Sequence, residues 1–318
     1  MKINKAVFID ATKTLSDQVR ATLNKPDRAH QLGVSGITFA INCQPDLNVE
    51  EIPHVVDEAE LIWVDHTQLP NEIAQRCSRL KHVVFMGTGA RSYMDIEGLA
   101  ALGIEVHLIK NYGDTAVAEC AFGLMWASAK RFGEMDRGIR QGLWLRTEGV
   151  QLTGKTVGLI GFGGIGAEMA RLCLGAGLNV VAWNRSPRTC PGVEFLPLEQ
   201  VLAQSDVISL HLLLEQATQE FMSDARLKQM KPGVILINTA RGGLIDEKAL
   251  VCHLKSGHIS YAGLDVYNQE PLPFNHPLTQ LENVMLLAHS AFRVPEATER
   301  LVDLALNVTE RIFSLNNK

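Results

Sequence analysis

Val157-Gly158-Leu159-Ile160-Gly161-Phe162-Gly163-Gly164-Ile165-Gly166 is the stretch that decides the fold of this chain. Its apolar first half predicts a buried parallel strand, and the glycines that follow have the G-x-G-x-x-G spacing. In this pattern Gly161 makes a tight turn, Gly163 lets the backbone approach a pyrophosphate, and Gly166 lets a helix pack on the strand. The helix over 167–174 would point its N-terminal amides at the phosphates, and a second strand follows at 179–183. The stretch therefore predicts a dinucleotide site, against the alternative of a glycine-rich turn that binds nothing.

The composition is that of an ordinary globular protein of about two domains. The 318 residues are 46% hydrophobic and 20% charged, and the formal net charge of -5 gives no electrostatic case for binding nucleic acid. The six cysteines form no C-x-x-C pair, the N-terminus carries no targeting signal, and no apolar run approaches the length of a membrane span. We therefore expect a cytoplasmic protein with reduced thiols and no membrane contact.

Strand and helix signals alternate on both sides of the glycine stretch, which favours parallel sheets built from βαβ units. In the first third the expected strands are 6–9, 37–41, 61–64, 83–86 and 104–108, and the expected helices are 17–23, 70–79 and 96–102. Beyond the glycine turn the expected strands are 207–210, 234–238, 262–265 and 284–287, and the expected helices are 250–255 and 295–315. Asp246 and Gly257 are the expected caps of the helix that runs through 250–255.

A different kind of element begins near Asp114 or Thr115. The helix expected from there to Ala127 is apolar nearly all round, so it should be buried on more than one side. A helix that joins two domains, or one in a dimer interface, meets that requirement. The segment 138–149 carries Trp144 among polar residues and is expected to be an arm or a loop.

Polar residues follow three strands of the second domain and carry the candidate chemistry. Arg241 follows the strand over 234–238, and its guanidinium can grip a carboxylate or a carbonyl oxygen. Asp265 and Glu270 follow the next strand, and His289 follows the last one. Singly, each has an ordinary explanation as a surface arginine, a turn carboxylate or a structural histidine. Together they border one crevice, where a carboxylate beside the histidine would stabilise its protonated form and keep it a proton donor.

These motifs, in this order, resemble those of the D-isomer-specific 2-hydroxyacid dehydrogenases. The resemblance covers most of the chain and is carried by 87–89, 117–119, 154–156, 161–166, 238–246, 265–271 and 276–278. It implies an α/β fold of two doubly wound parallel-sheet domains. A Rossmann cofactor domain (110–292) would be inserted in a flavodoxin-like substrate domain (1–109 and 293–318). It also implies a homodimer built on the cofactor domains.

The resemblance implies roles for individual residues as well. Arg241 would orient the substrate, His289 would be the acid/base and Glu270 its partner, while the Gly89 backbone would meet the substrate carboxylate. The residues expected to bind the cofactor are Thr88, Gly161, Gly163, Gly164, Ile165, Gly166, Asn184, Arg185, Ser186, Thr239, Ala240 and Asp265. No metal ligand is expected.

One departure from the family concerns the cofactor. Many relatives have an acidic residue after the second strand of the cofactor domain, where this chain has Asn184-Arg185-Ser186. A carboxylate there would repel a 2′-phosphate, whereas Arg185 can pair with one. We therefore expect a preference for NADP(H), with NAD(H) still possible. The alternative is that Arg185 and Arg188 are ordinary solvated charges.

The expected function is that of an oxidoreductase that reduces a small 2-keto acid, similar to glyoxylate or hydroxypyruvate, to a D-2-hydroxy acid. Formate oxidation is disfavoured because relatives of that type carry glutamine where Glu270 stands. The unusual loop over 64–67 leaves the identity of the keto acid open. The alternative from another class is a dinucleotide-sensing, corepressor-like interaction protein with little turnover. Such a protein would need a docking surface or long tails, neither of which the sequence suggests.

Overall fold

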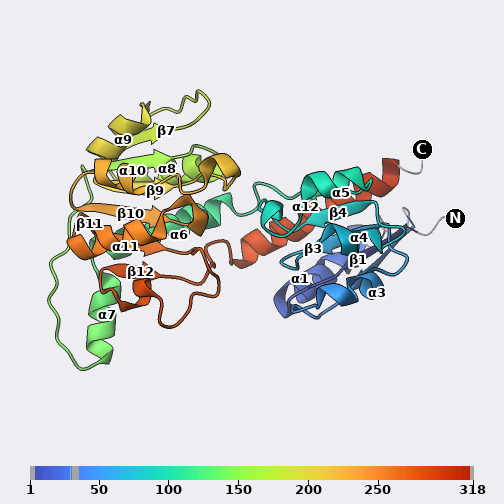
Figure 1. Ribbon diagram of the computed structural model, residues 1–318. Coiled ribbons are helices and arrows are strands. Elements are labelled where there is room, and N and C mark those ends of the chain that lie inside the picture. The colour runs from blue at the N-terminus through green and yellow to red at the C-terminus, as the bar shows by residue number, and fades with distance from the viewer. Residues whose placement is uncertain (1–3, 29, 31–35, 316–318) are drawn as a thin grey trace. The chain divides into compact units, whose positions relative to one another are not determined.

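The chain divides into two compact units. In the computed structural model, which describes residues 4–28, 30 and 36–315, one unit comprises Met1–Gly113 and Val294–Lys318, and the other Asp114–Arg293 (Figure 1). Each unit is a parallel sheet with helices on both faces, which confirms the expected fold class. Among the described helices none is long and apolar enough to cross a membrane.

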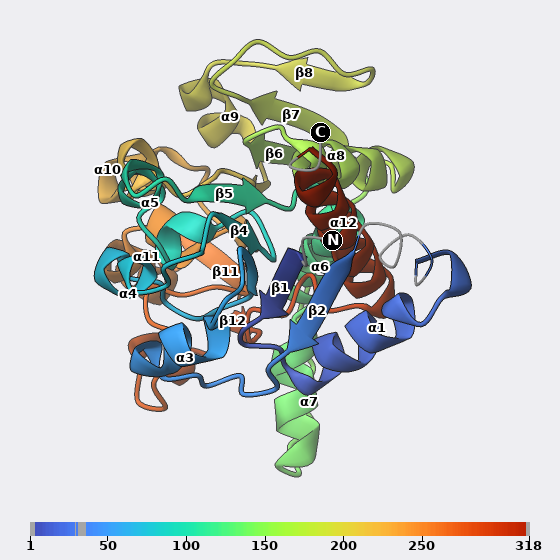
Figure 2. The same ribbon diagram turned by 90° about the vertical axis from the view of Figure 1, so that its right-hand side faces the viewer.

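Five parallel strands in the order β2-β1-β3-β4-β5 form the sheet of the first unit (Figure 2). They are β1 (Asn4–Phe8), β2 (Ile37–Ile41), β3 (Leu61–Val64), β4 (His82–Phe85) and β5 (Glu105–Leu108). All five strands expected from the sequence are present, close to their expected bounds. The strand order is the flavodoxin-like one.

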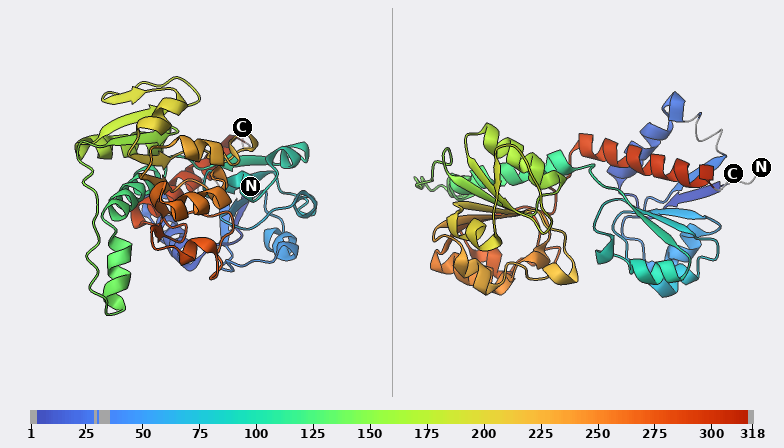
Figure 3. Two further views of the ribbon diagram at one scale, coloured as in Figure 1. Left: turned by 60° about the vertical axis from the view of Figure 1, so that its left-hand side comes forward. Right: turned by 90° about the horizontal axis from the view of Figure 1, so that it is seen from above.

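Helices cover both faces of this first sheet. On one face α1 (Lys13–Leu23) and α12 (Pro295–Leu315) pack against each other and share a core with Trp63, whose indole N–H donates to Thr309 Oγ1 at 2.9 Å (Figure 3). The other face packs against α3 (Ile52–Val56), α4 (Asn71–Gln75) and α5 (Ile96–Ala101).

The helix expected over 70–79 is wrong in its second half. After α4 the chain continues in tight turns, in which the Cys77 amide donates to the Ala74 carbonyl and the Leu80 amide to the Cys77 carbonyl. These turns bury Cys77 and Leu80 in the same core as Ile73 and Ala74 of α4.

Seven parallel strands in the order β12-β11-β10-β9-β6-β7-β8 form the sheet of the second unit. They are β6 (Thr156–Ile160), β7 (Asn179–Trp183), β8 (Val193–Phe195), β9 (Val207–Leu210), β10 (Val234–Asn238), β11 (Ile259–Leu264) and β12 (Val284–Leu286). The edge strand β8 was not expected, because its three residues carry no continuous apolar run. The direction of the strand order reverses between β6 and β9, and proteins with this kind of sheet bind ligands at the carboxyl ends of the strands at such a reversal.

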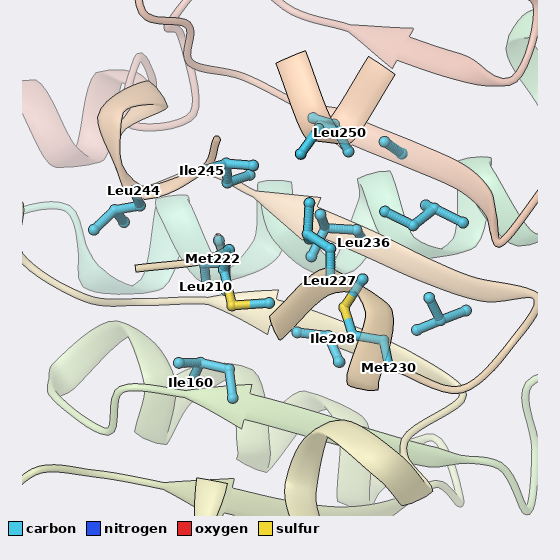
Figure 4. Packing of buried hydrophobic residues seen from close by; sticks show 14 of the residues in the cluster. Ile160, Ile208, Leu210, Met222, Leu227, Met230, Leu236, Leu244, Ile245 and Leu250 are labelled. Carbon is cyan, nitrogen blue, oxygen red and sulfur yellow. The ribbon is translucent and has the colours of Figure 1, made fainter. Parts of the chain in front are cut away.

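Two layers of helices enclose the second sheet. On one face lie α6 (Asp114–Ala129) and α8 (Gly164–Gly175), and on the other α9 (Leu198–Gln204), α10 (Asp224–Gln229) and α11 (Glu247–Ser256). Figure 4 shows the core under the second group, where Ile208 and Leu236 of the sheet meet Leu227 and Leu250. Both caps of α11 are confirmed: the Asp246 carboxylate accepts the Ala249 amide at 3.0 Å, and Gly257 is left-handed with φ 77°.

An extended arm follows helix α6 in the second unit. α6 is apolar as predicted, but Val117, Phe122 and Trp126 are only half-buried within this chain. A further helix, α7 (Phe132–Arg140), includes the beginning of the segment expected as an arm or loop, and 143–152 has neither helix nor strand. α7 and this segment extend away from the body of the second unit (Figure 3).

Candidate active site

The glycine turn joins β6 to α8 as the sequence predicts. Gly161 is left-handed with φ 96°, and a Cβ atom there would lie 2.6 Å from the His211 carbonyl oxygen. A Cβ atom on Gly166 would lie 2.6 Å from the Gly161 carbonyl oxygen, so packing within the protein requires both glycines. A Cβ atom on Gly163, in contrast, would meet no atom of the described chain within 4 Å. The turn therefore has space at Gly163, the position whose backbone approaches a pyrophosphate in this motif.

Gly164 and Ile165 begin α8, where the free amides of the helix N-terminus attract anions. A Cβ atom on Gly164 would overlap the Asp114 carboxylate at the start of α6. The beginnings of α6 and α8 therefore pack closely at this point, which fixes the direction of α8 beneath the turn.

The turn after β7 is tied to the glycine turn through Asn184. Asn184 Oδ1 accepts the Phe162 amide at 3.0 Å, and Asn184 Nδ2 donates to the Ser186 carbonyl oxygen at 2.8 Å. Arg185, Ser186 and Arg188 are exposed. Arg185 Nη1 lies 3.6 Å from Glu215 Oε2, an exposed ion pair of the kind that contributes little to stability.

Arg241 lies in the turn that leaves β10, and the buried Asn238 shapes this turn. Asn238 Oδ1 accepts the Ala240 amide at 3.0 Å, and its Nδ2 donates to the Arg241 carbonyl oxygen at 2.9 Å. The next residue, Gly242, has no room for a side chain, because a Cβ atom there would overlap the Tyr267 carbonyl group. The turns after β10 and β11 are therefore in direct contact.

Asp265, at the end of β11, is buried and holds the turn after β12. Its two carboxylate oxygens accept the amides of Ser290 and Ala291, each at 2.9 Å, and its main-chain oxygen accepts the His289 amide at 2.8 Å. Burial raises the pKa of Asp265, and the two amide hydrogen bonds oppose that shift. Asp265 thus sets the backbone from which the His289 side chain projects.

His289 and Glu270 form the closest polar contact of the site. His289 Nδ1 lies 2.6 Å from Glu270 Oε2, and Glu270 Oε1 accepts the Tyr267 amide at 2.9 Å. The two side chains are 33% and 35% exposed, so the pair is partly open to solvent. The Phe292 ring stands edge-on to the imidazole, with the ring centroids 6.4 Å apart.

The charge of Glu270 is stabilised within this cluster. Burial raises the pKa of Glu270, but the hydrogen bond from His289, the Tyr267 amide and the positive charge of Arg241 outweigh it, so the pKa is lowered. Glu270 is therefore ionised at neutral pH and presents a negative charge to His289 Nδ1. The three candidate catalytic residues lie in one electrostatic environment at the carboxyl ends of β10, β11 and β12.

Comparison with known proteins identifies the family. Residues 122–291 match the family model of the D-isomer specific 2-hydroxyacid dehydrogenase, NAD binding domain. A glyoxylate reductase of Korarchaeum cryptofilum is 35% identical over 80% of this chain and 79% of the relative. The chain belongs to the D-isomer specific 2-hydroxyacid dehydrogenases. It is thus an oxidoreductase of that family, as the motifs led us to expect.

Two further similarities cover most of the chain. A hydroxypyruvate reductase of Thermotoga maritima is 34% identical over 84% of this chain and 88% of the relative. The solved structure of an acyclic imino acid reductase, Bsp5, in complex with NADPH and D-Arg is 29% identical, covers 98% of this chain and 97% of that one, and superimposes with a TM-score of 0.86.

Two residues expected at the site of this family member lie in the other unit. Thr88 and Gly89 follow β4, where Thr88 is exposed and the Gly89 carbonyl oxygen accepts the Ser92 amide at 3.1 Å. Thr239, after β10, remains with the second unit, and its hydroxyl is buried without a hydrogen-bond partner among the described residues. This hydroxyl, two residues before Arg241, is a group that can form a hydrogen bond with a ligand.

His211 is a candidate site residue that sequence reasoning missed. It follows β9 directly, its carbonyl oxygen faces Gly161, and its Nε2 is buried without a partner among the described groups. Burial lowers the pKa of His211 to about 4, so the imidazole is neutral at physiological pH. The sequence did carry a signal, because the expected strand 207–210 ends immediately before it at the reversal of the strand order.

Proposed function

We propose that this dehydrogenase reduces a small 2-keto acid to a D-2-hydroxy acid with a nicotinamide cofactor. The observation that carries the proposal is the 2.6 Å contact between His289 Nδ1 and Glu270, with the charge of Arg241 beside it. Its relatives named glyoxylate reductase and hydroxypyruvate reductase support a keto acid of that size.

The residues of this chain supply the proton and the orientation. Because Nδ1 faces Glu270, His289 Nε2 is the atom that would donate the proton to the ketone oxygen. Arg241 would bind the substrate carboxylate and polarise the carbonyl through its forked donors. When bound, the cofactor supplies the hydride that the ketone carbon receives.

The second unit fits the cofactor, and we propose it as the cofactor domain. Gly163, Gly164, Ile165 and Gly166 would hold the pyrophosphate, and the unsatisfied hydroxyl of Thr239 suits a polar group of the ligand, with Ala240 next to it. Asp265 would support the nicotinamide end of the cofactor site, because it holds the turn that carries His289. The first unit would be the substrate domain, with Thr88 at the cofactor and the Gly89 backbone at the substrate carboxylate.

The cofactor is proposed to be NADPH in preference to NADH. Asn184 takes the place of a carboxylate, and the exposed Arg185 and Ser186 offer donors to a 2′-phosphate. Arg185→Ala should therefore raise the KM for NADPH at least about tenfold with little change for NADH, because only NADPH carries the phosphate. Steady-state kinetics with both cofactors measures the effect.

Asn184→Asp tests the same preference in the opposite way, by adding a carboxylate instead of removing an arginine. An aspartate can still accept the Phe162 amide, although it loses the hydrogen bond from Asn184 Nδ2 to the Ser186 carbonyl oxygen, and it introduces a charge that repels a 2′-phosphate. Asn184→Asp should shift kcat/KM toward NADH. Equal or better efficiency with NADH in the unmutated protein would contradict the proposed preference and leave the keto-acid reduction standing.

A panel of 2-keto acids tests the activity itself. Oxidation of NADPH is followed with glyoxylate, hydroxypyruvate, pyruvate and longer 2-keto acids, and the hydroxypyruvate product is analysed for its configuration. We expect turnover of a small 2-keto acid and a D product. Cofactor binding without turnover of any keto acid would instead support a dinucleotide-sensing interaction protein, and an L product would contradict the proposed orientation.

A further inference from the structure

Three side chains of the first unit come together at one end of its sheet, apart from the residues assigned to keto-acid reduction. His82 begins β4, and Glu105 and His107 lie on the neighbouring edge strand β5. In the parallel register His82 pairs with Glu105 and Val84 with His107, so the three side chains project from the same face of the sheet.

Each of the three side chains offers one atom, and the distances between these three atoms are typical of ligands to a single metal ion. His82 Nδ1 lies 3.2 Å from His107 Nε2, and Glu105 Oε2 lies 3.7 Å from each of these two nitrogen atoms. The distance between the nitrogen atoms alone would fit a hydrogen bond between the imidazoles. The carboxylate oxygen, however, is equally far from both rings and beyond hydrogen-bond distance of either.

A single ion explains this equal spacing. The point equidistant from the three atoms lies about 2.1 Å from each of them, which is the bond length of zinc to histidine nitrogen and carboxylate oxygen. Two imidazoles and one carboxylate are also a donor set that zinc uses when a further position is left to water.

The surroundings of the cluster suit a cation. The Glu105 side chain is 69% exposed and gives an ion access, whereas the two imidazoles are 16% and 14% exposed. The other charges that act on the rings are Lys81, Arg311 and Glu60, and the carboxylates of Glu105 and Glu60 balance the two positive charges.

We propose that His82, Glu105 and His107 bind a divalent transition-metal ion, with zinc as the favoured ion. The site joins the edge strand β5 to β4 at the amino-terminal ends of these strands. Thr88 and Gly89 follow the opposite, carboxyl end of β4. The ion therefore serves to fasten the sheet edge and takes no part in the proposed hydride transfer.

Zinc titration of the full-length protein tests the site. Isothermal titration calorimetry with zinc chloride at pH 7.5 should show one saturable ion per chain in a Cys43→Ser, Cys252→Ser background, which removes the exposed thiols that also bind zinc. Glu105→Gln should weaken this binding at least tenfold. Since Glu105 is exposed, this variant should fold normally.

His107→Gln should abolish the same binding step, and His258→Gln is its control. His258 stands beside His253 with ring centroids 5.2 Å apart, almost the separation of 5.3 Å between His82 and His107, but it belongs to no three-ligand group among the described residues. Cobalt in place of zinc should give the intense visible absorption of a tetrahedral site in the unmutated protein and lose it in Glu105→Gln. No saturable zinc binding in the unmutated protein, or binding that Glu105→Gln and His107→Gln leave unchanged, would overturn the proposal.

Discussion

His289 is held in a backbone conformation that non-glycine residues rarely adopt. Its φ is 48°, in the left-handed region, where a residue of this kind costs on the order of 1–3 kcal/mol. The hydrogen bonds from the amides of His289, Ser290 and Ala291 to Asp265 stabilise this turn. The strain and its compensation aim the imidazole at Glu270, so the orientation of the acid/base is built into the backbone.

The His289 imidazole is expected to supply the proton in the chemical step. His289→Ala should lower kcat by about 10²–10⁴-fold, because the transition state loses its general acid. The Kd for NADPH, measured by fluorescence titration, should remain nearly unchanged. A variant with near-normal kcat would remove His289 from the mechanism, and a large loss of cofactor affinity would indicate a structural role instead.

Glu270 is expected to set the pH range of the reaction. The lowered pKa of Glu270 keeps its carboxylate charged into acidic solution, so His289 faces a negative charge over the whole neutral range. In Glu270→Gln the imidazole gives up its proton at a lower pH, so keto-acid reduction should fall off at a lower pH than in the unmutated protein. The pH profile of kcat measures this shift.

The geometry makes that variant a clean test. The glutamine Oε1 can still accept the Tyr267 amide, which preserves the turn after β11. A profile that does not move would show that the contact between His289 and Glu270 has no influence on proton donation.

Within the turn between β6 and α8, one glycine is required by packing and another leaves space for a ligand. Gly161 is left-handed and faces a carbonyl oxygen, whereas Gly163 faces open space. Gly161→Ala should destabilise the fold by more than about 1 kcal/mol. Gly163→Ala should change the free energy of unfolding by no more than about 0.5 kcal/mol and yet weaken cofactor binding, since a methyl group would occupy the approach to the pyrophosphate.

Urea unfolding without cofactor, together with cofactor titration, distinguishes the two effects. Tight cofactor binding by a stable Gly163→Ala protein would show that the pyrophosphate does not approach this glycine. Equal destabilisation by both substitutions would mean that Gly163 serves packing as Gly161 does.

At the scale of the whole molecule, the arm formed by α7 and the segment 143–152 is the feature that indicates a protein partner. We propose that a second copy of the chain covers α7 and the segment after it. Phe132 and Ile139 of α7 are each 53% exposed, and Trp144 is 76% exposed. Large apolar side chains gathered on one projecting segment are typical of an interface. The half-buried Phe122 and Trp126 on α6 fit the same proposal.

The double variant Phe132→Glu, Trp144→Glu is expected to be monomeric. Two charges cannot be buried in an apolar interface without a large desolvation cost. Light scattering after size exclusion should give the mass of one 35.0 kDa chain for the variant and twice that mass for the unmutated protein. Phe274→Glu is the control, because Phe274 is 95% exposed and lies outside the arm. A monomeric unmutated protein, or a double variant that stays dimeric, would reject the proposal.

The features that the sequence by itself determined depend on interactions between residues close together in the chain. The apolar runs predicted the strands, and the turn chemistry at Asp246 and Gly257 predicted the caps of α11, because these signals act within a few residues of the chain. The glycine pattern predicted the βα turn for the same reason. The positions of Arg241, Glu270 and His289 at strand ends also followed, since parallel strands end at the same edge of a sheet. The short strand β8 and the tight turns after α4 lacked such signals.

Only the tertiary structure decided which of these groups meet. The carboxylate of Asp265 binds amides at Ser290 and Ala291, and Gly242 is required by the Tyr267 carbonyl group, yet neither partner is near in sequence. The cluster of His82, Glu105 and His107 likewise depends on the register between two strands. Hydrogen bonds and metal ligands act over about 2–3 Å, so their partners are set by how strands pair and turns pack, which no local pattern of residues encodes.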